Sequence, residues 1–280
     1  MDRLTLVLQQ FPVTASVLHA GTLAGSHSFP LSAGSENSCG HLHVVRRGRY
    51  LLQLADRKAI AINDPAVIYI PNSLQHILQS VGDDEAREVL CATVQLGDIA
   101  HEQITGSLPE VMLLSLSDVA ALDTTISLMF NEADSENWGW QVAQDSLVEY
   151  FLVLLLRALI DQNAVDAGIL AGLADDRLAK AMCAIQNNLG GDWSLTAMAS
   201  TAGMSRSRFA EHFKLVLGLT PHQYLTNCRM AVVQKQLRSG RAVNQIADEL
   251  GYSHPTALIR AFQQHTGVTP ASWAKQNAQP

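Results

Sequence analysis

The chain has 280 residues, of which 48% are apolar and 16% charged, so we expect a globular protein with room for two domains rather than a disordered one. No stretch approaches the roughly 20 apolar residues that a membrane span requires. The formal net charge of −7 taken alone disfavours a nucleic-acid partner.

The charge is divided unevenly along the chain. Residues 1–174 carry 8 basic and 20 acidic side chains, whereas residues 175–280 carry 11 basic and 6 acidic ones. A net charge of −12 followed by one of +5 predicts two domains, of which the second faces a polyanion. The first residues lack a basic n-region and a small-residue cleavage site, so we expect no secretory leader. The four cysteines show neither metal-type nor disulfide spacing. We therefore expect a cytoplasmic protein with reduced thiols, no cofactor and no membrane contact.

Residues 39–95 are predicted to be β structure, because short apolar or alternating runs are separated by turn signals. Several short strands with this punctuation favour a small barrel or jelly roll. The segment resembles the cupin-type sensor domain, through His43 with Arg47-Gly48 and through the stretch 64–76. The expected strands lie within 43–54, 66–71 and 89–94.

Three histidines of this segment are candidate metal ligands. His41 and His43 lie on one face of a strand, and His76 follows the second cupin-like stretch. Imidazole nitrogens suit zinc, copper, nickel or iron(II). The glutamate that metal-binding cupins usually add is replaced here by Arg47 and Gly48. Ordinary hydrogen-bonded histidines inside a barrel are therefore the alternative to a metal site.

Cys39 and Cys91 are candidate redox-sensing residues of the same segment. An exposed thiol of low pKa can react with an oxidant, and Cys91 is the preferred candidate for that role. The alternative is that both side chains are buried and act as small apolar residues.

Two helices are predicted to follow the β segment, at 118–130 and 140–160. The second contains an apolar stripe at helical spacing, which is expected either to pack on the barrel or to form a homodimer interface. Residues 161–174, with two glycines, are the predicted linker. The stripe consists of Leu147, Phe151, Leu154 and Ala158.

One motif occurs twice in the C-terminal third of the chain. Ala199, Gly203 and Ser205 recur 48 positions later as Ala247, Gly251 and Ser253. A fixed displacement indicates two copies of one supersecondary unit. After one inserted residue, Phe213, Gly218, Thr220 and Pro221 recur as Phe262, Gly267, Thr269 and Pro270.

Each copy has the parts of a helix-turn-helix. A short apolar-faced helix ends at Gly203, a residue that adopts the left-handed conformation of a tight turn, and Ser205 is a good N-cap for the next helix. Phe209, Phe213 and Val216 then fall on one inward face. The second helix of this pattern enters the major groove of DNA. An all-α interaction domain with two helical hairpins is the alternative.

The region 175–274 resembles the DNA-binding domain of the AraC/XylS family of regulators. The resemblance implies seven helices, a long helix near 221–237 that joins the two units, and binding to two successive major-groove segments. It is carried by the stretches 203–214, 218–221, 229–230, 246–252, 260–262 and 267–270.

The outward faces of the two recognition helices supply the candidate DNA contacts. Arginine and lysine can contact guanine edges or phosphates, whereas Glu211 either accepts from a cytosine amino group or only faces solvent. Gln263 and Gln264 stand where basic residues are common in the family, so the first helix is expected to dominate specificity. The candidates are Arg206, Ser207, Arg208, Ala210, Glu211 and Lys214 in the first helix, and His254, Thr256, Ile259, Arg260 and Gln263 in the second.

Together these patterns predict an α+β protein. A cupin-like β-barrel with a helical hairpin occupies residues 1–160, and an all-α domain with two helix-turn-helix units occupies residues 175–280. The expected function is non-enzymatic: a sequence-specific transcriptional regulator that binds double-stranded DNA, acts beside RNA polymerase, forms a homodimer and senses a small molecule or an oxidant. The alternative is a small-molecule- or metal-binding cupin protein whose helical domain mediates protein contacts.

Overall fold

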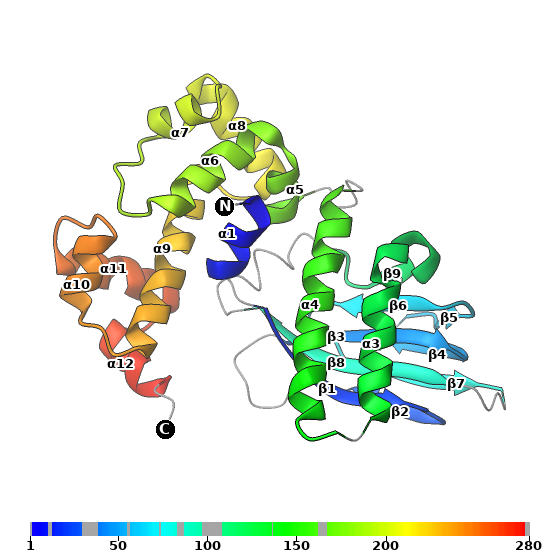
Figure 1. Ribbon diagram of the computed structural model, residues 1–280. Coiled ribbons are helices and arrows are strands. Elements are labelled where there is room, and N and C mark those ends of the chain that lie inside the picture. Colours follow the sequence, from blue (N-terminus) through cyan, green and yellow to red (C-terminus); the bar gives the residue numbers. More distant parts are fainter. Residues whose placement is uncertain are drawn as a thin grey trace. The chain divides into compact units, whose positions relative to one another are not determined.

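The computed structural model divides the chain into two compact units (Figure 1). One comprises residues 12–164, and the other joins residues 1–11 to residues 165–280. The structure describes residues 2–10, 13–29, 39–54, 57–72, 74–82, 87–96, 108–135, 137–161 and 167–277.

The unit of residues 12–164 is built on two antiparallel sheets, with the strand orders β1-β8-β3-β6-β9 and β2-β7-β4-β5. The three predicted strand segments are confirmed, and the first of them is a hairpin of two strands. The strands are β1 (Val13–Gly21), β2 (Ser26–Phe29), β3 (Cys39–Arg47), β4 (Arg49–Leu54), β5 (Ile60–Ile62), β6 (Ala66–Ile70), β7 (His76–Val81), β8 (Glu88–Leu96) and β9 (Met112–Ser115).

The central strands of the five-stranded sheet are buried on both faces. Strand β6 is buried at every position, whereas β4 alternates between buried and less buried residues. The inner face of the five-stranded sheet meets the other sheet, where Tyr50, Leu52 and Ile68 belong to one apolar core. Its outer face is covered by helices, because the apolar side chains of α4 (Trp140–Asp161) pack on β1 and line a small cavity with Tyr69 and Val94. Burial on both faces explains the continuous apolar runs of this sheet.

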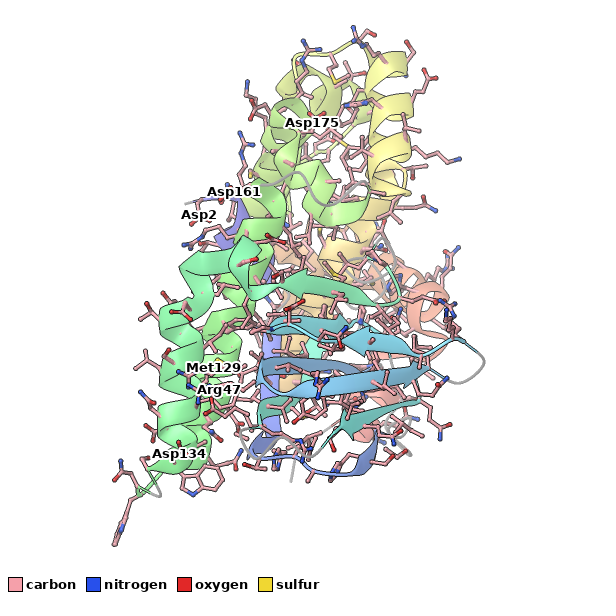
Figure 2. The ribbon with its side chains drawn as sticks, turned by 90° about the vertical axis from the view of Figure 1, so that its right-hand side faces the viewer. Asp2, Arg47, Met129, Asp134, Asp161 and Asp175 are labelled. Atoms are coloured by element: carbon pink, nitrogen blue, oxygen red, sulfur yellow. The ribbon has the colours of Figure 1, made fainter. Side chains whose placement is uncertain are left out.

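The two predicted helices of this unit form a hairpin. A 3₁₀ turn, η1 (Leu116–Leu122), precedes α3 (Asp123–Asp134), and α3 packs along α4. Asp134 lies near the tip of the hairpin (Figure 2). The predicted stripe on α4 is wrong in its register, since only Phe151 among its four members is fully buried. Helix α4 faces both the sheet and α3, so its buried side is wider than one stripe and comprises Gln144, Val148, Phe151, Leu152, Leu155, Leu156 and Leu159.

His41, His43 and His76 meet inside the barrel around Phe29. The Nε2 atoms of His43 and His76 lie 2.8 Å apart, and the three imidazole rings lie within 6.4 Å of one another, centroid to centroid. Burial lowers the pKa of all three, that of His41 to about 4, and the neighbouring imidazoles lower the pKa of His41 and His43 further. The neutral forms are therefore the stable ones in the folded unit.

The second unit is helical. Residues 175–277 form seven helices, as the family resemblance implies, and α9 is the long helix between the two helix-turn-helix units (Figure 1). None of the helices in the described part of the chain is long and apolar enough to cross a membrane. The seven are α6 (Asp176–Asn187), α7 (Leu195–Thr201), α8 (Arg206–Leu217), α9 (Pro221–Arg238), α10 (Val243–Glu249), α11 (Pro255–Thr266) and α12 (Pro270–Gln276).

Two further helices join this unit, and both lie outside the residues predicted for the helical domain. Helix α1 (Arg3–Gln10) lies within predicted residues 1–160 but packs on α6 and α9, where Val7 is fully buried. Helix α5 (Gly168–Ala174) lies in the predicted linker, 161–174, and packs on α6 and α8. Their short apolar faces complete the core of the helical unit. The two glycines of residues 161–174 suggested a linker, but packing against other helices stabilises a helix there.

Arg3 connects these two helices. Its guanidinium donates to the carbonyl oxygen of Leu173, at the end of α5, at 3.1 Å and to Asp176 Oδ1 at 2.8 Å. The first turn of the chain is thereby attached to the junction between α5 and α6.

We predict that Val7→Asp destabilises the helical unit by about 2–4 kcal/mol, because it places an unpaired carboxylate in an apolar contact. Scanning calorimetry of the full chain should show this as a lower unfolding temperature of the helical unit, with the β unit unchanged. Gln9→Asp, which changes an exposed residue of the same helix, is the matched control. Equal effects of the two substitutions would contradict the packing of α1 on this unit.

We also predict that the β unit loses stability as the pH falls below about 6.5, the pKa of an unfolded histidine. The folded unit holds the three histidines neutral, so the unfolded chain binds more protons in this range, and stability declines from pH 6.5 toward pH 4. Calorimetry at pH 7.5 and pH 5.0 should show a lower unfolding temperature of the β unit at pH 5.0. His43→Leu should reduce the difference; identical unfolding temperatures of the unsubstituted protein at both pH values would refute the prediction.

Candidate nucleic-acid interface

The two predicted turns have the same backbone geometry. Gly203 and Gly251 have φ angles of 64° and 71°, the left-handed region that favours glycine. The amide that follows each glycine donates back into the first helix, from Met204 to the Ala199 carbonyl at 2.9 Å and from Tyr252 to the Ala247 carbonyl at 3.0 Å. Both alanines are fully buried, which lets the next helix cross closely. The repeat in the sequence is thus a repeat in three dimensions.

Buried aromatic side chains hold the inner faces of both recognition helices. In α8, the rings of Phe209 and Phe213 are 5.4 Å apart, and Phe213 meets Tyr224 of α9 edge to face at 5.6 Å. In α11, Phe262 meets Trp273 of α12 at 6.0 Å. Phe209, Phe213 and Phe262 are inward as predicted, whereas Val216 is only half-buried. Such packing leaves the opposite faces of the two helices toward solvent.

Most of the predicted DNA contacts lie on these solvent-facing sides. The exposed ones are Arg206, Ser207, Arg208, Glu211 and Lys214 in α8, and His254, Thr256, Arg260 and Gln263 at or in α11. Ala210 and Ile259 are half-buried, so they present less surface to a partner. Ser205 occupies the N-cap position of α8, but its side chain makes no capping hydrogen bond.

His212 makes a contact beside the candidate interface that sequence reasoning missed. Its Nε2 donates to Asp175 Oδ2 at 2.7 Å, and Asp175 also caps α6 by accepting from the amides of Arg177 and Leu178 (Asp175 is labelled in Figure 2). Partial burial acts to raise the pKa of Asp175, but the hydrogen bonds from Leu178, His212 and Arg177 outweigh it and lower the pKa. Helix α8 is therefore attached to the start of α6. The partner lies 37 positions away, so no local pattern indicates the pair.

The predicted sensing residues lie in the core of the β unit. Among the described residues, no group of three histidine, cysteine, aspartate or glutamate side chains is arranged to hold a metal ion. Instead, His76 Nδ1 lies 2.7 Å from the Leu74 carbonyl oxygen, and its Nε2 lies next to that of His43. Cys39 and Cys91 are buried, and burial raises the pKa of Cys91 to about 12. Both thiols therefore lack the exposure on which a redox role was predicted, and Cys91 also lacks the low pKa.

Comparisons with known proteins agree with this architecture. A helix-turn-helix domain model matches residues 198–276, and a cupin model matches residues 2–161. The RCS-specific HTH-type transcriptional activator RclR of Escherichia coli K12 is 26% identical over 281 residues, which cover 99% of this chain and 98% of that protein. An uncharacterised HTH-type transcriptional regulator of Haemophilus influenzae is 26% identical over 260 residues, which cover 84% and 86%.

A solved structure also aligns along most of the chain. ToxT from Vibrio cholerae O395 is 13% identical, covers 95% of this chain and 98% of its own, and has a TM-score of 0.40. The two turns, the seven helices and the two matched domain models lead to one assignment. The chain belongs to the AraC/XylS family of DNA-binding transcriptional regulators and carries a cupin domain ahead of its helix-turn-helix domain.

Proposed function

We propose that the chain regulates transcription by reading one specific duplex with both recognition helices, under the control of a signal received by the cupin unit. The observation that carries this proposal is the pair of helices, α8 and α11, whose aromatic faces are buried and whose polar faces are exposed. They lie within residues 175–280, which have a net charge of +5. Such helices fit two successive segments of a major groove.

The two helices are expected to contribute unequally. Helix α8 offers Arg206, Arg208 and Lys214 on its exposed side, whereas α11 offers one arginine, Arg260, and imidazoles at His254 and His265. Arginine is the side chain that most often reads guanine, and each good base contact is worth about 1–3 kcal/mol of discrimination. We therefore propose that α8 supplies most of the specificity.

We predict that the protein binds DNA from upstream of its own gene tightly and selectively, with an affinity that falls steeply as salt rises, because bound phosphates release counterions. Arg206→Ala should weaken binding to the selected site by about 5- to 100-fold, and Arg260→Ala should weaken it less. Arg157→Ala, which removes the same charge from an exposed position of α4, is the matched control and should bind as the unsubstituted protein does. Fluorescence anisotropy across a salt series measures all four proteins.

The opposite outcome is as clear. Binding that shows no preference over random duplex, or no dependence on salt, would contradict the regulator proposal. It would favour the alternative in which the helical unit mediates protein contacts.

The cupin unit is proposed to act by shifting the population of conformations that differ in DNA affinity. In this scheme RNA polymerase is the partner at the promoter. A second copy of the chain is a further proposed partner, because the α3–α4 hairpin exposes several large apolar side chains. These are Leu128, Trp138, Trp140, Val142 and Tyr150.

We predict that Val142→Glu shifts the protein from dimer to monomer, because it puts a charge among these exposed apolar side chains. Multi-angle light scattering at micromolar concentration measures the mass. Leu113→Glu, at an exposed apolar position of β9, is the matched control and should leave the mass unchanged. A dimer that persists in Val142→Glu, or a monomer in the unsubstituted protein, would contradict an interface at the hairpin.

A further inference from the structure

The loop between α6 and α7 touches the turn of the second helix-turn-helix, backbone to backbone. A β-carbon on Gly190 would overlap the carbonyl oxygen of Glu249, and one on Gly251 would overlap the carbonyl oxygen of Gly190. Gly251 also needs its positive φ, but the φ of Gly190 lies outside that region, so close approach is the reason for glycine there. We call this contact, formed by Gly190, Gly191 and Glu249–Tyr252, the glycine seam.

Arg229 of α9 joins the two sides of the glycine seam. Its Nε donates to the carbonyl oxygen of Leu189 at 2.9 Å, and its Nη2 donates to that of Gly191 at 3.2 Å. The same guanidinium lies over the ring of Tyr252, with Cζ 5.4 Å from the ring centroid. One planar side chain thus holds the loop by hydrogen bonds and the turn by a cation–π contact.

The turn is also attached to the far end of α9. The carboxylate of Glu249 accepts from Gln236 at 3.1 Å and from both terminal nitrogens of Arg241, at 2.9 and 2.5 Å. These groups are exposed, so they add little stability, but the paired geometry orients Glu249. The backbone of Glu249 therefore meets Gly190 in a defined position.

The glycine seam connects the two recognition helices by a second route besides α9. Gly190 precedes α7, the first helix of one helix-turn-helix, and Gly251 lies in the turn that precedes α11 in the other. A single helix such as α9 can bend or twist, whereas attachment at two points restrains both separation and angle. Successive major-groove segments lie about 34–36 Å apart, so the restraint bears directly on which duplex fits both helices.

We infer that the glycine seam sets the spacing between the two DNA segments that the chain reads, with Gly190, Gly251 and Arg229 as positioning residues. This inference rests on the proposed function, because it needs both helices on one duplex. One added base pair moves a segment by about 3.4 Å and rotates it by about 35°, which a rigid reader cannot follow.

The test measures affinity against spacing. The full-length protein first selects a duplex from a randomised library, and footprinting locates the two protected segments. Duplexes with one or two base pairs inserted or deleted between these segments then compete with the parent. The unsubstituted protein should lose about tenfold or more in affinity for each single-pair change, as it would for a mismatched pair.

Gly190→Ala should flatten this dependence to less than about threefold, because the added methyl group forces the loop away from Glu249. Arg229→Gln should also flatten it, because it removes the side chain that joins the loop to the turn. Lys180→Gln, which removes a positive charge from an exposed position of α6 outside the glycine seam, is the control and should keep the spacing preference. Thermal melts of each variant check folding; if Gly190→Ala unfolds, Arg229→Gln decides the question.

The two possible failures are distinguishable. If the unsubstituted protein selects no duplex, the proposed function fails before any variant is compared. If it selects one and Arg229→Gln keeps the full spacing preference, α9 alone sets the spacing and the inference is overturned.

Discussion

The burial of Phe209, Phe213 and Phe262 is the constraint on which the helical unit depends. A recognition helix can present a polar face to DNA only if its other face is held in place, and in both repeats an aromatic pair or chain does this. The glycine turns and the buried alanines serve the same end, since they bring the first helix close enough to cover those rings. The positions of the exposed arginines are therefore set by aromatic, glycine and alanine residues of the helical unit that lie away from the exposed faces.

The helical unit was largely predictable from sequence because its determinants are local. A glycine with positive φ, a small residue at the helix crossing and aromatic residues three or four positions apart each leave a pattern within one turn or helix, and the pattern occurs twice. The pair formed by His212 and Asp175 left no such pattern, because its members are far apart in the sequence. Most of the predicted contact residues are exposed because they lie on the helix face opposite the buried aromatic residues. Their roles toward DNA stay predictions.

The β unit was less predictable, because its sheets are assembled from distant segments. Strands β3, β6 and β8 stand out as compact apolar runs, since the five-stranded sheet is covered on both faces. Strands β1 and β2 mix polar and apolar residues and show no such run. The histidines are a similar case: their spacing on β3 was visible, but the partner of each imidazole is set by the way β7 pairs in the other sheet. Burial of the three imidazoles together then lowers the pKa of each, and the neighbouring rings lower the pKa of His41 and His43 further.

The place of α1 has a consequence for how such regulators can be recombined. The chain enters the helical unit, leaves it at residue 11 and returns at residue 165, so the cupin unit is an insertion between two pieces of one fold. A chimaera that joins a foreign sensor to residues 165–280 would leave behind the helix that carries Val7 and Arg3. A working exchange of sensors is therefore expected to need the first eleven residues of the chain that supplies the helical unit. The inserted unit is connected to the helical unit at two points of the chain, and a change of conformation can be transmitted through either. The two units are therefore joined at two points of the chain, not at a single linker.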